Sequence, residues 1–460
     1  MTTPLTKPLP SGERGQRFAL FSSRVVTPAG VRPAAIVIDG GRIAAVVNRE
    51  AAPAGMPVED LGNLVISPGL VDAHVHINEP GRTDWEGFET ATRAAAAGGV
   101  TTLVDMPLNS SPVTTTPAAL EAKRAAALGK CWVDVGFYGG LVPGNLADVE
   151  PLIDAGVCGV KAFMCDSGLP EFPPAGEAEL REALPVLGRR GVPLLVHAEI
   201  ASPVKDPPPQ LTRYDDWLAM RPERFERDAV ALICKLAVEY GAPVHVVHLA
   251  NSFLTPFISR AKSAGAPLTV ETCPHYLHFC AEQIASADPR FKCAPPIRQE
   301  HHREGLWEGL ASGVIDTIGS DHSPCLPEMK QLDSGDFDRA WGGVSSLQLT
   351  LSTVWTGAAM RSIGIDRVAR WLSENPATLI GLGGVKGRVA AGFDADLCVW
   401  DPDEEWSVRG EELEHRHKIT PYEGERLRGR VKRTYVRGEL AYDDGEFPAG
   451  PVGQLLRRGN

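Results

Sequence analysis

The sequence lacks several features that would indicate a secreted, membrane-bound or nucleic-acid-binding protein. Its nine cysteines include no CxxC pair, and an odd number does not suit a framework of disulfides. It has no dense run of lysine and arginine, which argues against nucleic acid or an anionic membrane surface as a partner. No stretch approaches about 18 consecutive apolar residues, and residues 1–17 contain no apolar signal-peptide core. We therefore expect a reduced, cytoplasmic protein.

The composition is that of an ordinary globular protein. Hydrophobic residues make up 43% and charged residues 23% of the 460 residues. This length suits one large domain together with a smaller one. The formal net charge of -12 does not identify a substrate. Residues 1–16 are polar, and we expect them to form a loose arm.

Both ends of the chain have the character of short strands with tight turns. Residues 18–26 and 35–47 are apolar runs, and the Asp-Gly-Gly sequence at 39–41 is typical of a hairpin turn. Residues 387–400 and 430–440 have the same pattern. Because chain termini often lie close together, we predict one small, sandwich-like β domain built from residues 18–66 and 384–460.

The middle of the chain, residues 67–383, alternates strand-like runs with alanine-rich helical stretches. We predict strands at residues 64–77, 101–106, 132–138, 158–164, 193–198, 243–249, 268–272 and 316–320. We predict helices at residues 86–97, 117–128, 177–190, 224–240 and 254–264. Eight alternating strands indicate an α/β fold, a (β/α)8 TIM-like barrel. The alternative is an open doubly wound sheet, but the glycine-rich dinucleotide turn typical of that fold is absent from the sequence.

A His-x-His pair stands at the end of the first predicted barrel strand. Residues i and i+2 of a strand point to the same side, so His74 and His76 can ligate one metal ion together. The pair could equally be two ordinary core or surface histidines. Its position favours metal binding, because barrel active sites lie at the carboxyl ends of the strands.

Four more candidates stand at or near the ends of later strands. They are Lys161, His197, His248 and Asp321. Each alone has an ordinary explanation: a histidine can be structural, the lysine can reach solvent, and the aspartate can cap a turn. His245 also competes with His248, three residues away. Together the positions predict that one set of side chains converges on one rim of the barrel.

Lys161 is the informative member of this set. A protonated amine is repelled by metal cations, but burial lowers the pKa of a lysine. The neutral amine could add carbon dioxide, and the resulting carbamate would offer two anionic oxygens to bridge two cations. Two cations could then share a hydroxide, because metal binding lowers the pKa of water to about 7.

The same arrangement predicts a reaction class. Asp321 would ligate one cation, take the proton of the hydroxide and pass it to the departing nitrogen. A cation facing the substrate would polarise the carbonyl that is attacked. Hydrolysis of an unactivated amide suits this chemistry.

The run Ser67–His76 and the six candidates resemble the amidohydrolase superfamily, in its cyclic amidohydrolase branch of allantoinases, hydantoinases or dihydropyrimidinases, and dihydroorotases. The resemblance covers nearly the whole chain. It implies two divalent metal ions, with zinc expected and cobalt, manganese or iron as alternatives, and a homotetramer. It also implies the full ligand set, with Lys161 carbamylated: His74, His76, Lys161, His197, His248 and Asp321.

Several segments resemble allantoinases in particular. They are residues 78–82, 85–87, 105–109, 271–276, 294–298, 320–330, 341–344 and 415–422. Hydantoinases usually lack the Asp-Met-Pro-Leu-Asn and Trp-Gly-Gly segments among these. The resemblance implies hydrolytic opening of allantoin, a cyclic ureide, to allantoate. A hydantoinase or dihydropyrimidinase with the same mechanism is the alternative, and a non-catalytic assembly protein, which would have lost ligands, is a third reading.

Departures and matches at single positions refine the expected substrate site. Asn78 stands where dihydroorotases have an arginine that holds a carboxylate. Asn109 follows the second strand, where the family places loops that face the substrate, although a turn-forming role explains it equally well. Cys293 and Gly343 are at positions where relatives hold the ring amide through backbone groups. We therefore predict Asn109, Cys293 and Gly343 as substrate-binding residues.

Overall fold

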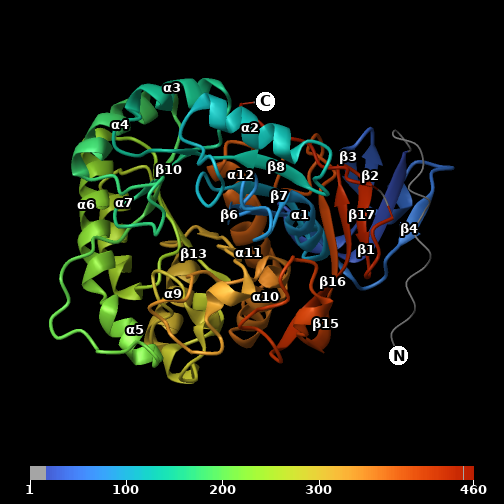
Figure 1. Cartoon of the computed structure of the whole chain (residues 1–460). Helices are drawn as coiled ribbons and strands as arrows, with labels where there is room; N and C mark the ends of the chain where they lie inside the picture. Colours follow the sequence, from blue (N-terminus) through green and yellow to red (C-terminus); the bar gives the residue numbers. More distant parts are fainter. Residues whose placement is uncertain (1–16, 449, 460) are drawn as a thin grey trace.

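The computed structural model describes residues 17–448 and 450–459, so the loose arm expected at residues 1–16 lies outside the described residues. Figure 1 shows a large body of helices around a core of strands, with a smaller β-sheet body at one side. The first strands (blue) and the last strands (red) lie together in that smaller body.

The smaller body is one eight-stranded sheet that combines both ends of the chain. Its order is β17-β16-β15-β5-β1-β2-β3, and β4 pairs with β1. The antiparallel pair of β5 with β15 joins the two ends, as the sequence predicted. The strands are β1 (Phe18–Thr27), β2 (Gly30–Asp39), β3 (Arg42–Val47), β4 (Val58–Asp60), β5 (Val65–Pro68), β15 (Leu397–Ser407), β16 (Arg426–Val436) and β17 (Glu439–Asp443).

The larger body is a closed parallel barrel, which confirms the predicted barrel and excludes the open sheet. One run of strands is β6-β7-β8 and the other is β9-β10-β11-β12-β13-β14. Only Tyr138 separates β8 from β9, so these two form one barrel position. The strands are β6 (Leu70–Val75), β7 (Val100–Asp105), β8 (Asp134–Phe137), β9 (Gly139–Gly140), β10 (Val160–Phe163), β11 (Leu194–His197), β12 (Val244–Val246), β13 (Leu268–Thr272) and β14 (Thr317–Ile318).

The barrel closes where the chain beyond β14 meets β6. Val75 forms a parallel bridge with His322, and the backbone N–H of His76 donates to His322 O at 2.8 Å. Asp72 Oδ1 accepts from the backbone N–H groups of His74 and Ser320, both at 3.1 Å. These contacts place the end of the first strand beside the end of the last.

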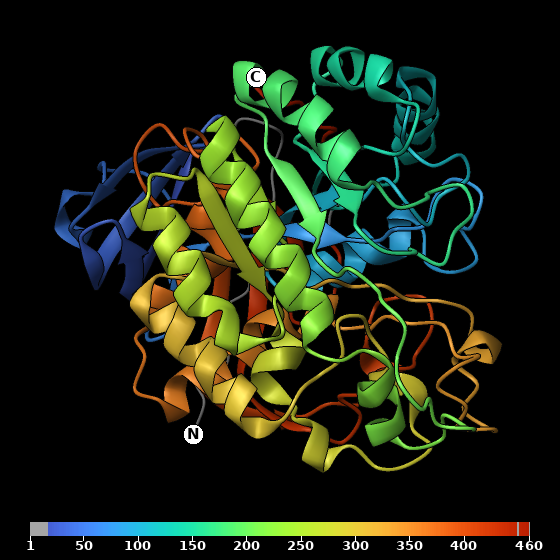
Figure 2. The same ribbon diagram turned by 90° about the vertical axis from the view of Figure 1, so that its left-hand side faces the viewer.

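Helices cover the outside of the barrel strands, as the side view in Figure 2 shows. They are α1 (Phe88–Ala97), α2 (Pro117–Ala127), α3 (Leu146–Asp154), α4 (Glu177–Arg190), α5 (Tyr214–Met220), α6 (Arg224–Tyr240), α7 (Thr255–Ser263), α8 (Pro274–His278), α9 (Glu300–Ser312), α10 (Thr350–Met360), α11 (Ile365–Ala369) and α12 (Asn375–Leu379). Within the described ranges, no helix is long and apolar enough to cross a membrane. All nine cysteines are free and buried.

Several sequence-based boundaries need correction; the strand predicted at residues 243–249, for example, ends at Val246. Two of the corrections involve glycines. The strand predicted at residues 64–77 is two strands, because the chain leaves the small sheet after Pro68 and enters the barrel at Leu70. Between them, a Cβ at Gly69 would lie 2.3 Å from the side chain of Thr101, so only glycine fits this passage. The first helix begins at residue 88, not 86, since Gly87 has a φ of +110°. The predicted division of the chain after residues 66 and 383 stays a prediction.

A buried charge cluster ties the barrel to the small sheet. Lys386 Nζ lies 2.8 Å from Asp134 of β8, 3.1 Å from Asp394 and 2.6 Å from Asp396, just before β15. Arg437, which follows β16, forms an ion pair with Asp134 as well. The Lys386 side chain is only 2% exposed, so its charge is balanced inside the protein.

Replacing Lys386 by methionine tests this cluster. The three carboxylates would stay buried with one cation fewer, so we expect the free energy of unfolding to fall by about 3–5 kcal/mol in urea titrations. The matched control is Lys235→Met on the exposed face of α6, where a change within about 0.5 kcal/mol is expected. An equal effect of the two substitutions would contradict the proposed contribution of the cluster.

Candidate metal centre

His74, His76 and Asp321 form one buried group of metal-type ligands at the barrel seam. His74 Nε2 lies 3.2 Å, and His76 Nε2 3.5 Å, from Asp321 Oδ1. The two histidines come from the end of β6 and the aspartate follows β14. Ligand atoms of these three residues are close enough together to hold one cation.

His197 and His248 continue the group along the rim. The His248 ring is 5.4 Å from the His74 ring and 4.6 Å from the His197 ring, measured between centroids. His245, the alternative to His248, instead lies 2.8 Å from Thr269 Oγ1 through its Nδ1 and does not line the cavity described below. The structure therefore brings His248, and not His245, to the other candidates.

Lys161 is completely buried beneath these side chains. Its Nζ has no hydrogen-bond partner among the described residues and lies 5.1 Å from the ring centre of Phe163. Burial lowers the pKa of Lys161 to about 8, although the charge of Asp321 opposes this shift. The positive charge of Lys161 in turn helps to lower the pKa of His76, His197 and His248, so the amine is close to the imidazoles.

These residues fit a metal centre with a modified lysine. A buried amine without a partner is costly, and so is the buried Nδ1 of His248, which also lacks one among the described residues. Four imidazoles and a carboxylate are ligands that zinc and similar cations accept. A carbamate at Lys161 would replace the unpaired amine by an anion that such cations attract.

Buried carboxylates hold two of the ligand histidines in place. His74 Nδ1 donates to Glu271 Oε1 at 2.6 Å, which leaves Nε2 for a cation. His197 Nε2 donates to Glu199 Oε2 at 2.8 Å, which leaves Nδ1. Burial alone would raise the pKa of Glu271, but His74 and His245 beside it lower it to about 2, so it is ionised.

Several rim residues have a left-handed backbone. The φ angles are +40° at His248, +46° at Asp321, +68° at Asn78 and +66° at Asn109. Asparagine adopts this conformation readily, but histidine rarely does, and such positions cost on the order of 1–3 kcal/mol each. Strain of this kind gathers at functional sites, and nothing in the sequence indicated it at His248.

A cavity of about 520 Å³ opens above the centre. It is lined by every predicted site residue except Lys161, which lies below the lining. Other lining residues also carry polar or aromatic groups. Phe163 ends β10, and Ser323 and Trp341 lie in segments already noted for their resemblance to allantoinases. The remaining ones stand in loops or at the short helix α5, where no pattern in the sequence indicated a site; they are Asp166, Ser167, Trp217, Arg221, Lys292, Asp338 and Arg339.

The predicted substrate-binding residues lie around this cavity, but backbone groups of two of them already form hydrogen bonds within the protein. The side-chain amide of Asn109 lies 3.3 Å from His76 Nδ1. Cys293 O accepts from Trp217 Nε1 at 3.2 Å, and Gly343 N–H donates to Lys292 O at 2.8 Å. At Gly343, a Cβ would lie 2.3 Å from Ser323 O, so the loop requires glycine there. Contact with a substrate stays a prediction for all three.

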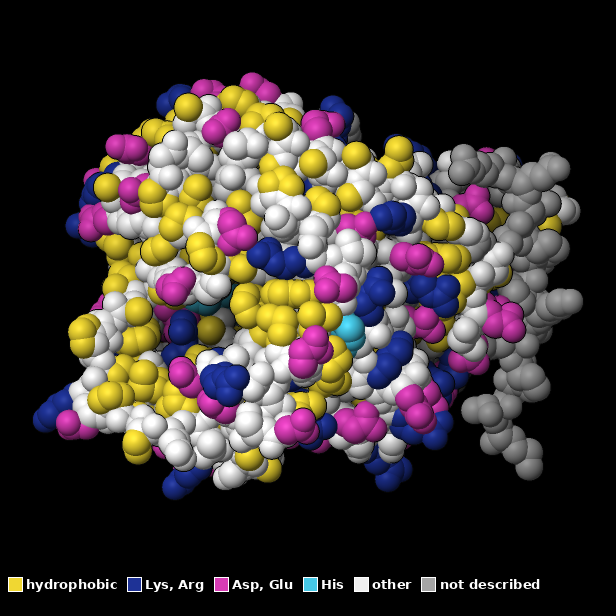
Figure 3. Space-filling model, viewed as in Figure 1, with side chains coloured by type: hydrophobic (Ala, Val, Ile, Leu, Met, Phe, Trp, Pro, Cys, Tyr) yellow, Lys and Arg dark blue, Asp and Glu magenta, His cyan; other side chains and the backbone are white. Residues whose placement is uncertain are grey.

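The face of the molecule seen in Figure 3 has no charge pattern suited to a polyanion. In the face shown in Figure 3, basic and acidic side chains are interspersed and form no continuous basic stripe. This distribution agrees with a small molecule as the partner.

The buried histidines predict how the metal-free protein responds to acid. Burial lowers the pKa of His76 to about 4 and also lowers that of His197 and His248, whereas an unfolded histidine titrates near 6.5. The unfolded chain therefore binds more protons as the pH falls from about 6.5 to 4, and the folded state loses stability in that window. Urea midpoints of metal-free protein should fall from pH 7 to pH 5, and less steeply in His76→Gln. A midpoint that stays constant, or an unchanged slope in the variant, would contradict this.

Comparisons with known proteins agree with this geometry. The sequence model of the Amidohydrolase family matches residues 65–441. Allantoinase from Streptomyces avermitilis is 48% identical over 447 residues, which cover 96% of this chain and 98% of that protein. Allantoinase from Arabidopsis thaliana is 43% identical over 95% of this chain and 90% of its own length. Allantoinase from Saccharomyces cerevisiae is 45% identical over 87% of each chain.

Similar solved structures are hydantoinases. L-Hydantoinase (dihydropyrimidinase) from Arthrobacter aurescens has a TM-score of 0.91 at 30% identity, covering 96% of this chain and 100% of that chain. Dihydropyrimidinase from Brevibacillus agri NCHU1002 has a TM-score of 0.86 at 25% identity, covering 96% and 99%. With barrel, terminal sheet and sequence in agreement, the chain belongs to the amidohydrolase family and, within it, to the allantoinases.

Proposed function

We propose that this protein hydrolyses the cyclic amide of allantoin and opens its ring to give allantoate. The reaction class follows from the observation that four histidines and Asp321 gather at one rim near Lys161, whose amine has no hydrogen-bond partner among the described residues. The substrate follows from the similarity to allantoinases of three organisms.

We infer that two divalent cations would be held at the rim. His74, His76 and Asp321 would hold one, His197 and His248 the other, and Lys161 as a carbamate would stand between them. When bound, the cations would supply an ionised water at neutral pH and polarise the carbonyl of the substrate. Zinc is the proposed metal, with cobalt, manganese or iron as alternatives, because all accept imidazole ligands.

Asp321 is the residue that moves the proton. Burial alone would raise the pKa of Asp321, but His74, His76 and His248 hold it well below its usual range, so the carboxylate is ionised. In the proposed reaction it accepts a proton from the attacking water as oxygen bonds to the carbonyl carbon. The C–N bond then breaks, and Asp321 gives the proton to the departing ring nitrogen.

The cavity suits a small polar ring. Its volume of about 520 Å³ lies within the range of small-molecule sites, and Asn109, Arg221 and Lys292 give its wall hydrogen-bonding groups. We propose Asn109, Cys293 and Gly343 as the substrate-binding residues. A non-catalytic assembly role is not favoured, since all six ligand positions carry a suitable side chain. We also propose a cytoplasmic homotetramer.

Lys161→Met tests the metal centre. Without the amine, no carbamate can form, so the variant should bind fewer than the two metal equivalents of the parent protein, counted by plasma mass spectrometry. We expect kcat to fall by at least about 100-fold, since even outer partners of metal ligands contribute 10–100-fold. Lys235→Met, on the surface of α6, should keep both metals. Full metal content in Lys161→Met would contradict the bridging role.

A substrate panel tests the choice of allantoin. Metal-loaded protein should open allantoin with a kcat/KM well above its values for hydantoin and dihydrouracil, followed by amide absorbance and by chromatography of the products. The similarity to solved hydantoinases provides the alternative. Turnover of hydantoin or dihydrouracil without turnover of allantoin would show that the alternative is right.

A further inference from the structure

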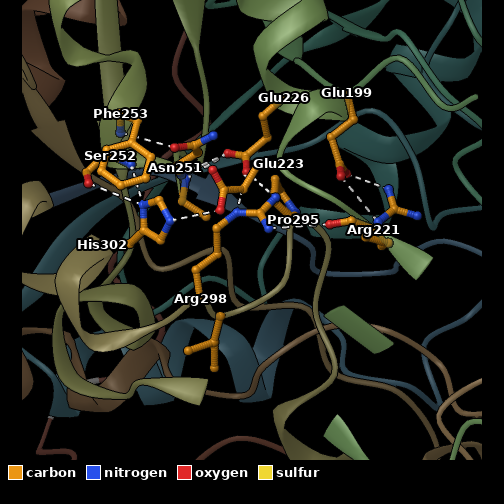
Figure 4. Close-up of polar contacts among 12 residues, drawn as sticks. Glu199, Arg221, Glu223, Glu226, Asn251, Ser252, Phe253, Pro295, Arg298 and His302 are labelled. Atoms are coloured by element: carbon orange, nitrogen blue, oxygen red, sulfur yellow. Dashed lines mark hydrogen bonds and ion pairs between the residues drawn. The ribbon is translucent and has the colours of Figure 1, made fainter. Parts of the chain in front are cut away.

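A buried ion pair near the candidate metal centre joins helix α6 to the loop that precedes α9. Arg298 Nε and Nη2 donate to Glu226 Oε2 of α6 at 2.8 and 2.5 Å, and both side chains are at most 3% exposed. Figure 4 shows the two side chains facing each other, with the Arg221–Glu199 pair beside them. The proposed reaction assigns no role to either residue.

The second oxygen of Glu226 holds the turn that follows His248. Glu226 Oε1 accepts from the backbone N–H groups of Ala250 and Asn251 at 3.0 and 3.1 Å. These residues come two and three positions after His248, whose backbone is left-handed. One carboxylate thus fixes the strained turn at a candidate ligand.

Arg298 ends the segment of residues 293–298, which we call the cavity wall because its first residues, Cys293 and Ala294, line the cavity. Two side chains of α5 hold carbonyl groups of this wall: Trp217 Nε1 donates to Cys293 O at 3.2 Å, and Tyr214 OH donates to Ile297 O at 3.0 Å. Arg298 is the only charged side chain within residues 293–298. It therefore connects the wall to Glu226 and, through it, to the His248 turn.

The same guanidinium extends the connection toward His197. Arg298 Nη1 donates to Arg221 O at 3.4 Å. The Arg221 side chain forms an ion pair with Glu199, and Glu199 Oε2 accepts from His197 Nε2 at 2.8 Å. Two candidate ligands and the cavity wall are thus linked by two adjoining ion pairs.

Such a pair is poorly explained by stability alone. A buried ion pair often contributes no more to stability than well-packed apolar side chains of the same size, because desolvation of both charges offsets their attraction. An arginine–carboxylate pair does, however, fix the relative orientation of the two segments that carry it, because a guanidinium and a carboxylate meet in few geometries.

We propose that Glu226 and Arg298 are positioning residues, which keep the His248 turn and the cavity wall at residues 293–297 in a fixed position relative to each other. The inference rests on the proposed function of the cavity as the place where a cyclic amide is opened. It assigns the pair to the placement of the substrate ring against the metal ligands, and not to the retention of metal.

Two variants separate this role from a structural one. Arg298→Lys keeps the charge but loses the two-point contact, and Glu226→Gln keeps an acceptor for Ala250 and Asn251 but turns an amide N–H toward the guanidinium. We expect kcat/KM per folded chain to fall by about 10–100-fold for the best cyclic amide of the parent protein, with two metal equivalents retained.

The matched control is Glu223→Gln in the same cluster. Glu223 Oε1 lies 3.3 Å from His302 Nε2 at the outer end of the network, and its side chain is 43% exposed. Among the described residues, its carboxylate has a hydrogen bond to His302 and none to the cavity wall or to residues 248–251. Its kinetic constants and metal content should match those of the parent protein.

Hydrogen–deuterium exchange gives a readout that does not depend on turnover. The backbone amides of residues 248–251 and of Cys293, Ala294 and Ile297 should exchange faster in Arg298→Lys than in the parent protein, but not in Glu223→Gln. The proposal would be overturned by any of three results in the Arg298 and Glu226 variants. These are unchanged exchange at those amides, an unchanged kcat/KM per folded chain, and a loss of activity that only follows the loss of metal. If the parent protein opens no cyclic amide, the proposed function fails, and exchange still decides the role of the pair.

Discussion

The closure of the barrel between its first and last strands is the constraint on which the candidate centre depends. Near Val75, the end of β6 pairs with the chain beyond β14, and this closure brings His74 and His76 to Asp321. Residues about 250 positions apart in sequence thereby become neighbours. An open sheet of the same strands would leave these side chains at opposite edges.

Burial then sets the chemistry of the centre. His76, His197 and His248 stay neutral because the interior disfavours their charged form, and neutral imidazole is the form that binds cations. Lys161 loses part of its preference for the charged form for the same reason. The carboxylates of Glu199 and Glu271 remain ionised. They orient the imidazoles of His197 and His74, respectively. Burial at the carboxyl end of the barrel thus keeps these imidazoles neutral, and the buried carboxylates behind them fix which ring nitrogen faces a cation.

Features with a local signal could be predicted from the sequence, and features made by distant contacts could not. The bounds of α4 and α6 match the prediction, since left-handed Gly191 and Gly241 end those helices. The six candidates at the rim follow from their positions after apolar strands. By contrast, the passage at Gly69 and the roles of Trp217 and Arg298 depend on partners far away in sequence.

Anomalous diffraction from crystals of the zinc-loaded protein would show whether this rim holds a pair of metal ions. We expect two peaks at the carboxyl end of the barrel, one bordered by His74, His76 and Asp321 and the other by His197 and His248. Electron density extending from Lys161 Nζ should reach both. A single peak beside an unextended Lys161, or no peak at this rim, would rule out a metal pair bridged by Lys161.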